Sequence, residues 1–109
     1  MRVNKLCMSA VLMLASVTAV AAPDQIVTSI LTKNNCLACH AIDKKVVGPA
    51  YRAVGEKFKD EPNAKDLLVG KIKNGSAGTW GPVPMPPNPG ISEEDARQVV
   101  EWILAGAPE

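Results

Sequence analysis

Two cysteines and a histidine lie close enough together in this sequence to act as one chemical unit. Cys36 and Cys39 are separated by two residues, and His40 follows the second cysteine directly. Two thiols on a single helical turn can each add to one vinyl group of a porphyrin, and the adjacent imidazole can then bind the iron. The C-x-x-C-H pattern is therefore interpreted as the attachment site of a covalently bound c-type haem.

Two other interpretations of the same residues are weaker on chemical grounds. A structural zinc site needs four ligands, nearly always cysteine and histidine, and beyond residue 7 the sequence offers only Cys36, Cys39 and His40. A thioredoxin-like redox pair belongs at a strand-to-helix junction of a βαβ unit, and no strand pattern precedes Cys36. The chemistry of these residues favours haem attachment.

A proline-rich segment supplies a residue for the other side of the iron. Residues 74–90 contain five prolines and four glycines, so no helix or strand can continue through them. Trp80, Val83 and Met85 nevertheless carry apolar area that needs burial. A thioether suits haem iron opposite a histidine, and Met85 is the only methionine after residue 22. Met85 is therefore predicted to be an axial ligand, with a gap-filling core methionine as the alternative.

The first 21 residues have the layout of a secretory signal peptide. Arg2 and Lys5 form a short positive head, and an apolar run closed by small residues extends from residue 6 to residue 22. We predict cleavage after Ala21, with cleavage after Ala22 as the alternative, and a mature domain over residues 22–109 that does not insert stably into a membrane. An uncleaved membrane anchor is the other interpretation, but the run is barely long enough to span a bilayer.

The composition indicates one small and nearly neutral domain. The chain has 109 residues, 12 of them basic and 11 acidic, and signal removal takes two of the basic ones, Arg2 and Lys5. This balance argues against a broad nucleic-acid-binding surface, so no nucleic acid partner is expected. A domain of this size with few aromatic residues has a thin core, and a covalently held haem would add a large apolar body to it.

Four segments with apolar residues at helical spacing predict an all-α domain. The first begins at residues 23–24 and ends just before Cys36, so it delivers the attachment motif to a fixed place. The others span residues 49–58, residues 62 to about 73, and the stretch from the Ser92 cap to Gly106. The last helix is expected to pack across the first, and the sequence does not decide whether Trp102 is buried. The predicted buried faces are Ile26, Val27, Ile30 and Leu31; Tyr51, Val54 and Phe58; Leu67, Leu68 and Ile72; and Ala96, Val99, Val100 and Ile103.

Taken together, the sequence resembles a short class I bacterial cytochrome c, of the periplasmic monohaem kind that shuttles electrons to nitrite reductase or terminal oxidases. The likeness spans essentially all of residues 22–109. Its most specific strings are CLACHAID (36–43), VGPAY (47–51), IKNGS (72–76) and WGPVPMPPN (80–88). The resemblance implies a class I cytochrome c fold, with about four short helices wrapped around one haem c. It also implies thioether bonds from Cys36 and Cys39, with His40 and Met85 as axial ligands.

The resemblance implies four supporting contacts as well. The Pro49 carbonyl would accept a hydrogen bond from the haem histidine. The residues alone make Pro49 a candidate for this contact, but they favour a role in a simple turn or a helix start. Trp80 would donate its indole N–H to a haem propionate, and Asn88 would orient the methionine sulfur. Lys71 occupies a position where relatives often have arginine, and it would offer the propionate a point donor rather than a fork.

The expected function is one-electron transport in a respiratory chain, because an iron with both axial positions filled can only change its oxidation state. The expected acceptors are nitrite reductase, a terminal oxidase or a peroxidase, and the expected donor is a cytochrome bc1-type complex or another small carrier. The chain is expected to be a periplasmic monomer and not an enzyme. The alternative is a haem enzyme or gas sensor with an openable sixth position, and a third interpretation is a haem domain inside a larger complex.

An apolar docking patch is expected beside the exposed haem edge, as the family suggests. Its predicted residues are Leu37, Val46, Pro82, Val83 and Pro84. The lysines expected near it are Lys33, Lys44 and Lys45. These lysines either steer charged partners or form ordinary solvated surface, and the sequence leaves both interpretations open.

Overall fold

The computed structural model describes residues 11–18 and 23–109. The predicted cleavage site and most of the predicted signal peptide therefore lie outside the described residues. Residues 11–18, inside the predicted signal, form no helix or strand, and their side chains are exposed. Across both described ranges, no helix has the length and apolar character needed to cross a membrane.

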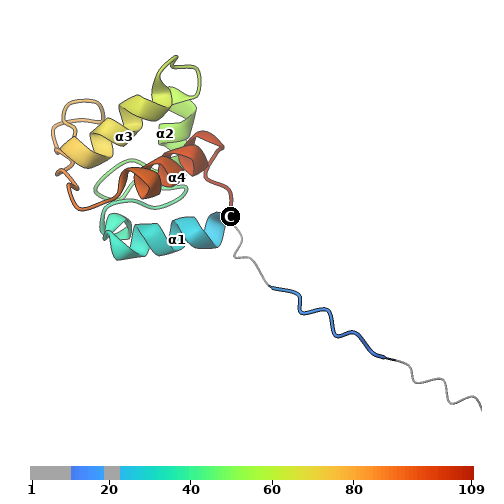
Figure 1. Ribbon diagram of the computed structural model, residues 1–109. Coiled ribbons are helices and arrows are strands. Elements are labelled where there is room, and N and C mark those ends of the chain that lie inside the picture. The colour runs from blue at the N-terminus through green and yellow to red at the C-terminus, as the bar shows by residue number, and fades with distance from the viewer. Residues whose placement is uncertain (1–10, 19–22) are drawn as a thin grey trace, which may run out of the picture.

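Four α-helices and one short 3-10 helix form the regular structure of the described chain (Figure 1). The α-helices are α1 (Pro23–Lys33), α2 (Tyr51–Phe58), α3 (Ala64–Asn74) and α4 (Glu93–Leu104), and the 3-10 helix η1 (Cys36–Ala38) follows α1. Within the described ranges there is no strand, and only two isolated β-bridges occur. The prediction of an all-α domain is confirmed.

Helix α4 is the centre of the packing. It contacts α1, α2 and α3, and Figure 1 shows it lying between α1 and α3. Its buried side chains are Ala96, Val99, Val100, Trp102 and Ile103. The predicted crossing of the first and last helices is thus confirmed. Trp102 is buried, and its indole N–H donates to the Pro108 carbonyl at 2.9 Å.

The start of α4 follows the predicted capping chemistry. The Ser92 hydroxyl accepts a hydrogen bond from the backbone N–H of Asp95 at 3.0 Å. Acidic side chains fill the first turn, where they favour the positive end of the helix dipole. The helix ends at Leu104, and Gly106 then takes a φ of 98°, which suits glycine. This cap fixes where the long loop after α3 must end.

Two helices begin later than predicted. Helix α2 begins at Tyr51 rather than residue 49, because Ala50 is extended and the Tyr51 N–H donates backwards to the Ala41 carbonyl at 2.9 Å. Helix α3 begins at Ala64 rather than Pro62, because residues 62–63 belong to a turn closed by a hydrogen bond from the Ala64 N–H to the Glu61 carbonyl.

Two predicted core residues face solvent instead. Ile26 is 38% exposed and Leu67 is 41% exposed. In α1 the i, i+3, i+4 positions Val27, Ile30 and Leu31 already form the buried face, and Ile26 lies beside it. In α3 the buried face is Ala64, Leu68 and Val69, with Ile72 half-buried. Apart from Ile72, the remaining predicted core residues are buried.

Candidate haem site

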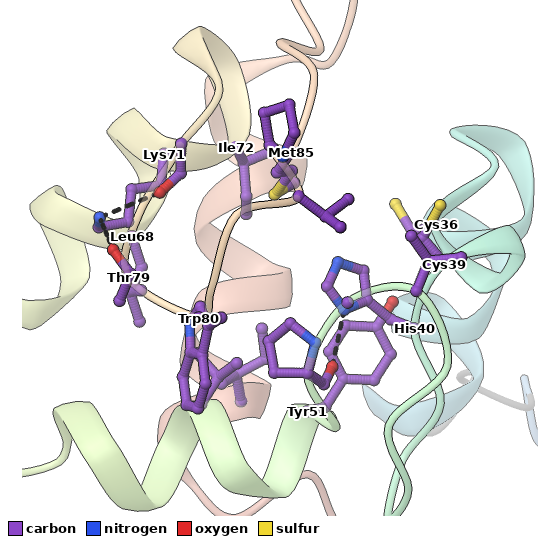
Figure 2. A pocket seen from close by; sticks show the side chains of 18 of the residues that line it. Cys36, Cys39, His40, Tyr51, Leu68, Lys71, Ile72, Thr79, Trp80 and Met85 are labelled. Carbon is purple, nitrogen blue, oxygen red and sulfur yellow. Dashed lines mark hydrogen bonds between the residues drawn. The ribbon is translucent and has the colours of Figure 1, made fainter.

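The C-x-x-C-H motif folds into one tight turn directly after α1. Asn35 takes a left-handed φ of 57°, η1 follows, and the His40 N–H donates to the Cys36 carbonyl at 3.1 Å. Both thiols are free and half-buried, and burial raises the pKa of the Cys36 thiol. Figure 2 shows the two sulfur atoms beside the His40 ring at one edge of a cavity. Thioether attachment needs this arrangement.

One nitrogen of the His40 ring makes a hydrogen bond, and the other is available to bind a metal. Its Nδ1 lies 2.7 Å from the Pro49 carbonyl oxygen. A carbonyl can only accept a hydrogen bond, so Nδ1 carries the proton and donates it. Nε2 therefore keeps the lone pair that a metal needs. The structure places Pro49 where the family resemblance implies.

Two residues that the sequence analysis did not assign to the site also hold the His40 ring. A Cβ added at Gly48 would lie 2.4 Å from His40 Cε1, so any larger residue there would force the ring to move. On another side, the Tyr51 ring is tilted by 31° against the imidazole, with 5.2 Å between ring centroids. The VGPAY string was the only sequence signal for these contacts, because the loop between Gly48 and His40 brings them together.

Met85 enters the same cavity from the loop between α3 and α4 (Figure 2). It pairs with Ser76 through two backbone hydrogen bonds, of 2.8 and 3.1 Å. Gly75 makes this pairing possible, because it has a φ of 84° and its missing Cβ would lie 2.8 Å from the Met85 carbonyl oxygen. The segment before Met85 is thus closed at its base by backbone contacts.

The three remaining predicted site residues line the cavity or lie in the Met85 loop. Lys71 lines the cavity and donates to the hydroxyls of Ser76 and Thr79, at 3.2 Å each. Trp80 also lines the cavity and is 40% exposed.

Asn88 lies in the same loop between α3 and α4 as Met85, here called the methionine loop, and ties this loop to α3. Its side-chain amide donates to the carbonyls of Ile72 at 3.3 Å and Pro86 at 3.4 Å. Its backbone N–H donates to the same Ile72 carbonyl at 3.0 Å. The predicted role of Asn88 toward the Met85 sulfur stays a prediction, because these hydrogen bonds go to backbone oxygens.

The residues present fit a haem. All four α-helices contribute apolar side chains to the cavity wall, among them Leu31, Val54, Leu68 and Val100. Two thiols, an imidazole and a thioether enter this apolar space, and Lys71 supplies a positive charge for carboxylates. The Tyr51 hydroxyl is buried in this wall and makes no hydrogen bond within the described chain. In the described part of the chain, no cluster of three or more histidine, cysteine or acidic side chains could hold a zinc ion.

Comparison with known proteins agrees with this geometry. Residues 28–107 match the family model described as cytochrome c. The chain is 47% identical to cytochrome c-552 of Nitrosomonas europaea over 90 residues, which cover 83% of this chain and 87% of that protein. It is 51% identical to cytochrome c-551 of Pseudomonas aeruginosa over 77 residues, which cover 70% of this chain and 73% of that one.

A solved structure has the same fold. The crystal structure of wild-type Nitrosomonas europaea cytochrome c552 superposes with a TM-score of 0.71 at 47% identity, covering 72% of this chain and 98% of that one. The fold and the site thus define a small class I monohaem cytochrome, and the chain belongs to the cytochrome c family. It binds haem c covalently through Cys36 and Cys39 and is an electron carrier. These findings confirm the predicted family, cofactor and carrier function.

Proposed function

We propose that His40 and Met85 fill the two axial positions of the haem iron, so that the chain is a six-coordinate one-electron carrier and not an enzyme. When bound, the haem supplies an iron that gains and loses one electron. The observation that carries the proposal is the fixed placement of both ligands at one cavity. The Pro49 carbonyl oxygen lies 2.7 Å from His40 Nδ1 and orients the ring, and two backbone hydrogen bonds with Ser76 hold Met85 in place.

Rigid ligands suit electron transfer for a physical reason. If the same two side chains occupy the axial positions in both oxidation states, little of the surroundings has to rearrange when the charge changes. His40 is held by Pro49, Gly48 and Tyr51, and the prolines around Met85 restrict its backbone. A methionine opposite a histidine also raises the reduction potential above that of two histidines.

We assign three supporting roles at the cavity. Lys71 has three N–H donors, and its two hydroxyl partners leave one for a haem propionate. The Trp80 indole N–H has no partner among residues 11–18 and 23–109, which leaves it for the second oxygen of such a carboxylate. Asn88 keeps the methionine loop against α3 and thereby sets the direction of the sulfur.

Carbon monoxide and hydrogen peroxide distinguish this carrier from a peroxidase-like enzyme or a gas sensor. The proposal predicts that the wild-type protein binds neither ligand at neutral pH, because Met85 occupies the sixth position. Met85→Ala should bind carbon monoxide in the ferrous form. Rapid carbon monoxide binding by the wild type would support an openable site and contradict the proposal.

The apolar docking patch (Leu37, Val46, Pro82, Val83 and Pro84) is proposed as the surface where redox partners meet the haem edge. Leu37 and Val46 are each 48% exposed, and Val83 is 61% exposed. Pro82, Val83 and Pro84 also line the cavity, and exposed apolar side chains at the edge of a cofactor site are typical of an interaction surface. Lys33, Lys44 and Lys45 are exposed and take part in none of the ion pairs of the described chain, so they would attract acidic partners.

The partners proposed for this patch are the redox proteins of a periplasmic respiratory chain. Nitrite reductase, a terminal oxidase or a peroxidase would accept the electron, and a cytochrome bc1-type complex or another small carrier would donate it. The predicted signal peptide at residues 1–21 supports this location, because a positive head followed by an apolar run that ends in small residues is typical of an export signal. Mass spectrometry of the exported protein should give the mass of a chain that begins at Ala22. A mass that includes residues 1–21 would contradict this prediction.

A further inference from the structure

The tip of the methionine loop, residues 77–84, is held in place by side chains rather than by backbone hydrogen bonds. The Ser76–Met85 pair closes the base of this segment. Between residues 77 and 84, no backbone-to-backbone hydrogen bond joins the segment to the rest of the described chain. Gly78 and Gly81 have φ values of 81° and 116°, so the backbone changes direction on both sides of Thr79 and Trp80. The tip is therefore held mainly by side chains.

Two lysines from different helices provide that support. From α3, the Lys71 ammonium donates to the Thr79 hydroxyl at 3.2 Å. From α2, the Lys57 ammonium lies 5.6 Å from the centroid of the Trp80 ring, within the range of a cation–π interaction. The two contacts hold adjacent residues of the tip from two sides, one through a hydroxyl and one through an aromatic face.

Lys57 has no acidic partner in the described chain, whereas Lys59, two residues further on, has one. Lys59 pairs with Glu56 at 2.8 Å, and Lys57 takes part in no ion pair there. The ammonium of Lys57 is thus available to the Trp80 ring, which is otherwise 40% exposed.

We propose that Lys57 is a positioning residue for the cofactor site: its cation–π contact with Trp80 holds the tip of the methionine loop closed over the cavity. The proposal rests on the proposed function in one respect, that Met85 is the iron ligand carried by this loop. Displacement of Met85 requires the loop to open, and opening removes Trp80 from Lys57. An exposed contact of this kind changes such an opening equilibrium about two- to fivefold.

The direct test is nuclear magnetic resonance of the haem-loaded protein. The Lys57 side-chain protons should show an upfield ring-current shift that disappears in Trp80→Leu. In Lys57→Gln, the heteronuclear Overhauser effects of the Trp80 indole and of the backbone amides of residues 77–81 and 83 should fall, since the tip moves more freely. Lys57→Arg keeps the cation and should restore them, and Lys59→Gln, a matched loss of charge, should leave them unchanged.

A titration of the ferric protein with imidazole measures the consequence at the iron. Lys57→Gln should raise the apparent imidazole affinity about two- to fivefold, with Lys57→Arg and Lys59→Gln at the wild-type value. Equal shifts in Lys57→Gln and Lys59→Gln, or no change in tip mobility, would overturn the proposal. If imidazole instead binds the wild type without displacing Met85, the proposed ligation is wrong, and the magnetic resonance comparison alone then decides the role of Lys57.

Discussion

His40 shows how much of this site depends on single residues around one ring. Its Nδ1 donates a hydrogen bond to the Pro49 carbonyl. Gly48 lies close against one side of the ring because it has no Cβ, and the Tyr51 ring packs against another side. A proton on Nδ1 fixes the tautomer, and the two packing neighbours fix the ring's rotation. The orientation of the imidazole is thus determined by residues outside the C-x-x-C-H motif.

The first prediction concerns the space at Gly48. In Gly48→Ala the new methyl group would lie 2.4 Å from His40 Cε1, so the ring must move and the Nδ1 hydrogen bond must lengthen. We expect a loss of about 1–3 kcal/mol in the free energy of unfolding, measured with denaturant, together with changed paramagnetic shifts of the His40 ring protons. Gly90→Ala is the control, because nothing lies within 4 Å of the added methyl group. Equal stability of the two variants would contradict the account.

The second prediction concerns the Tyr51 hydroxyl, which is buried and makes no hydrogen bond. Removing an unsatisfied buried polar group costs little, so Tyr51→Phe should be neutral or stabilising by up to about 1 kcal/mol at pH 7. Tyr51→Leu should be destabilising, because it loses the ring contacts with His40 and Trp102. A marked destabilisation by Tyr51→Phe would show that the hydroxyl has a partner in the haem-loaded protein.

The same residue predicts a dependence on alkaline pH. Burial raises the pKa of Tyr51 above its ordinary value of 10.0, so the folded protein keeps the phenol proton where the unfolded chain loses it. The contribution of Tyr51 to the free energy of unfolding is fully present below pH 10. It falls by about 1.4 kcal/mol per pH unit as the pH rises above 10. Denaturant unfolding at pH 7 and pH 11 should therefore show a smaller loss in Tyr51→Phe than in the wild type. Identical losses would contradict the raised pKa.

At the scale of the helices, two mid-helix glycines have opposite roles. A Cβ at Gly55 in α2 would lie 2.2 Å from the Ile103 carbonyl oxygen of α4, so glycine allows the two helices to approach closely. At Gly70 in α3, nothing lies within 4 Å of the added group. The same residue type is thus a packing requirement in one helix and a cost in backbone entropy in the other.

The third prediction follows from this contrast. Gly55→Ala should lower the free energy of unfolding by about 1–3 kcal/mol, because α2 must move away from α4. Gly70→Ala should raise it by about 0.5–1 kcal/mol, because alanine restricts the unfolded chain and favours the helix. Denaturant unfolding of the two variants measures both effects. A stabilised Gly55→Ala would show that the α2–α4 contact is looser than described.

The sequence predicted the helices better than the contacts between them. Apolar spacing located all four α-helices, and the Ser92 cap was correct, because these signals are local. Ile26 and Leu67 were wrongly placed in the core, since periodicity gives a face but not its width. The contacts of Gly48, Gly55 and Lys57 were not foreseen, because each depends on where a segment distant in sequence comes to lie.

The same distinction holds for the site. The attachment motif and Met85 followed from residue chemistry and from the scarcity of other ligands. Pro49 was a candidate from the residues that the family resemblance then favoured, whereas Trp80, Asn88 and Lys71 came from family resemblance alone. The structure places Pro49, Lys71 and Trp80 at the cavity and Asn88 in the loop that borders it. Their roles toward the haem stay predictions, and the variants proposed above address the loop that carries two of them.

At the scale of the whole molecule, one part of the surface, the apolar docking patch, is proposed to meet redox partners. The fourth prediction is that Val83→Glu slows electron transfer to a purified nitrite reductase about tenfold, because a carboxylate at an apolar contact must lose its water. Its absorption spectrum should be unchanged. Leu67→Glu is the matched control, since Leu67 is an exposed apolar residue of α3 outside the apolar docking patch. Equal transfer rates for both variants in stopped-flow measurements would contradict the assignment of the patch.

The measurement that tests the central claim most directly is an absorption spectrum of the haem-loaded protein in both oxidation states, for the wild type and for Met85→Ala. A methionine ligand gives the ferric form a weak long-wavelength band from sulfur-to-iron charge transfer. We expect this band in the wild type and its loss in Met85→Ala. A wild type without the band, or with a high-spin spectrum, would mean that the sixth position is open or differently filled, and would contradict the account.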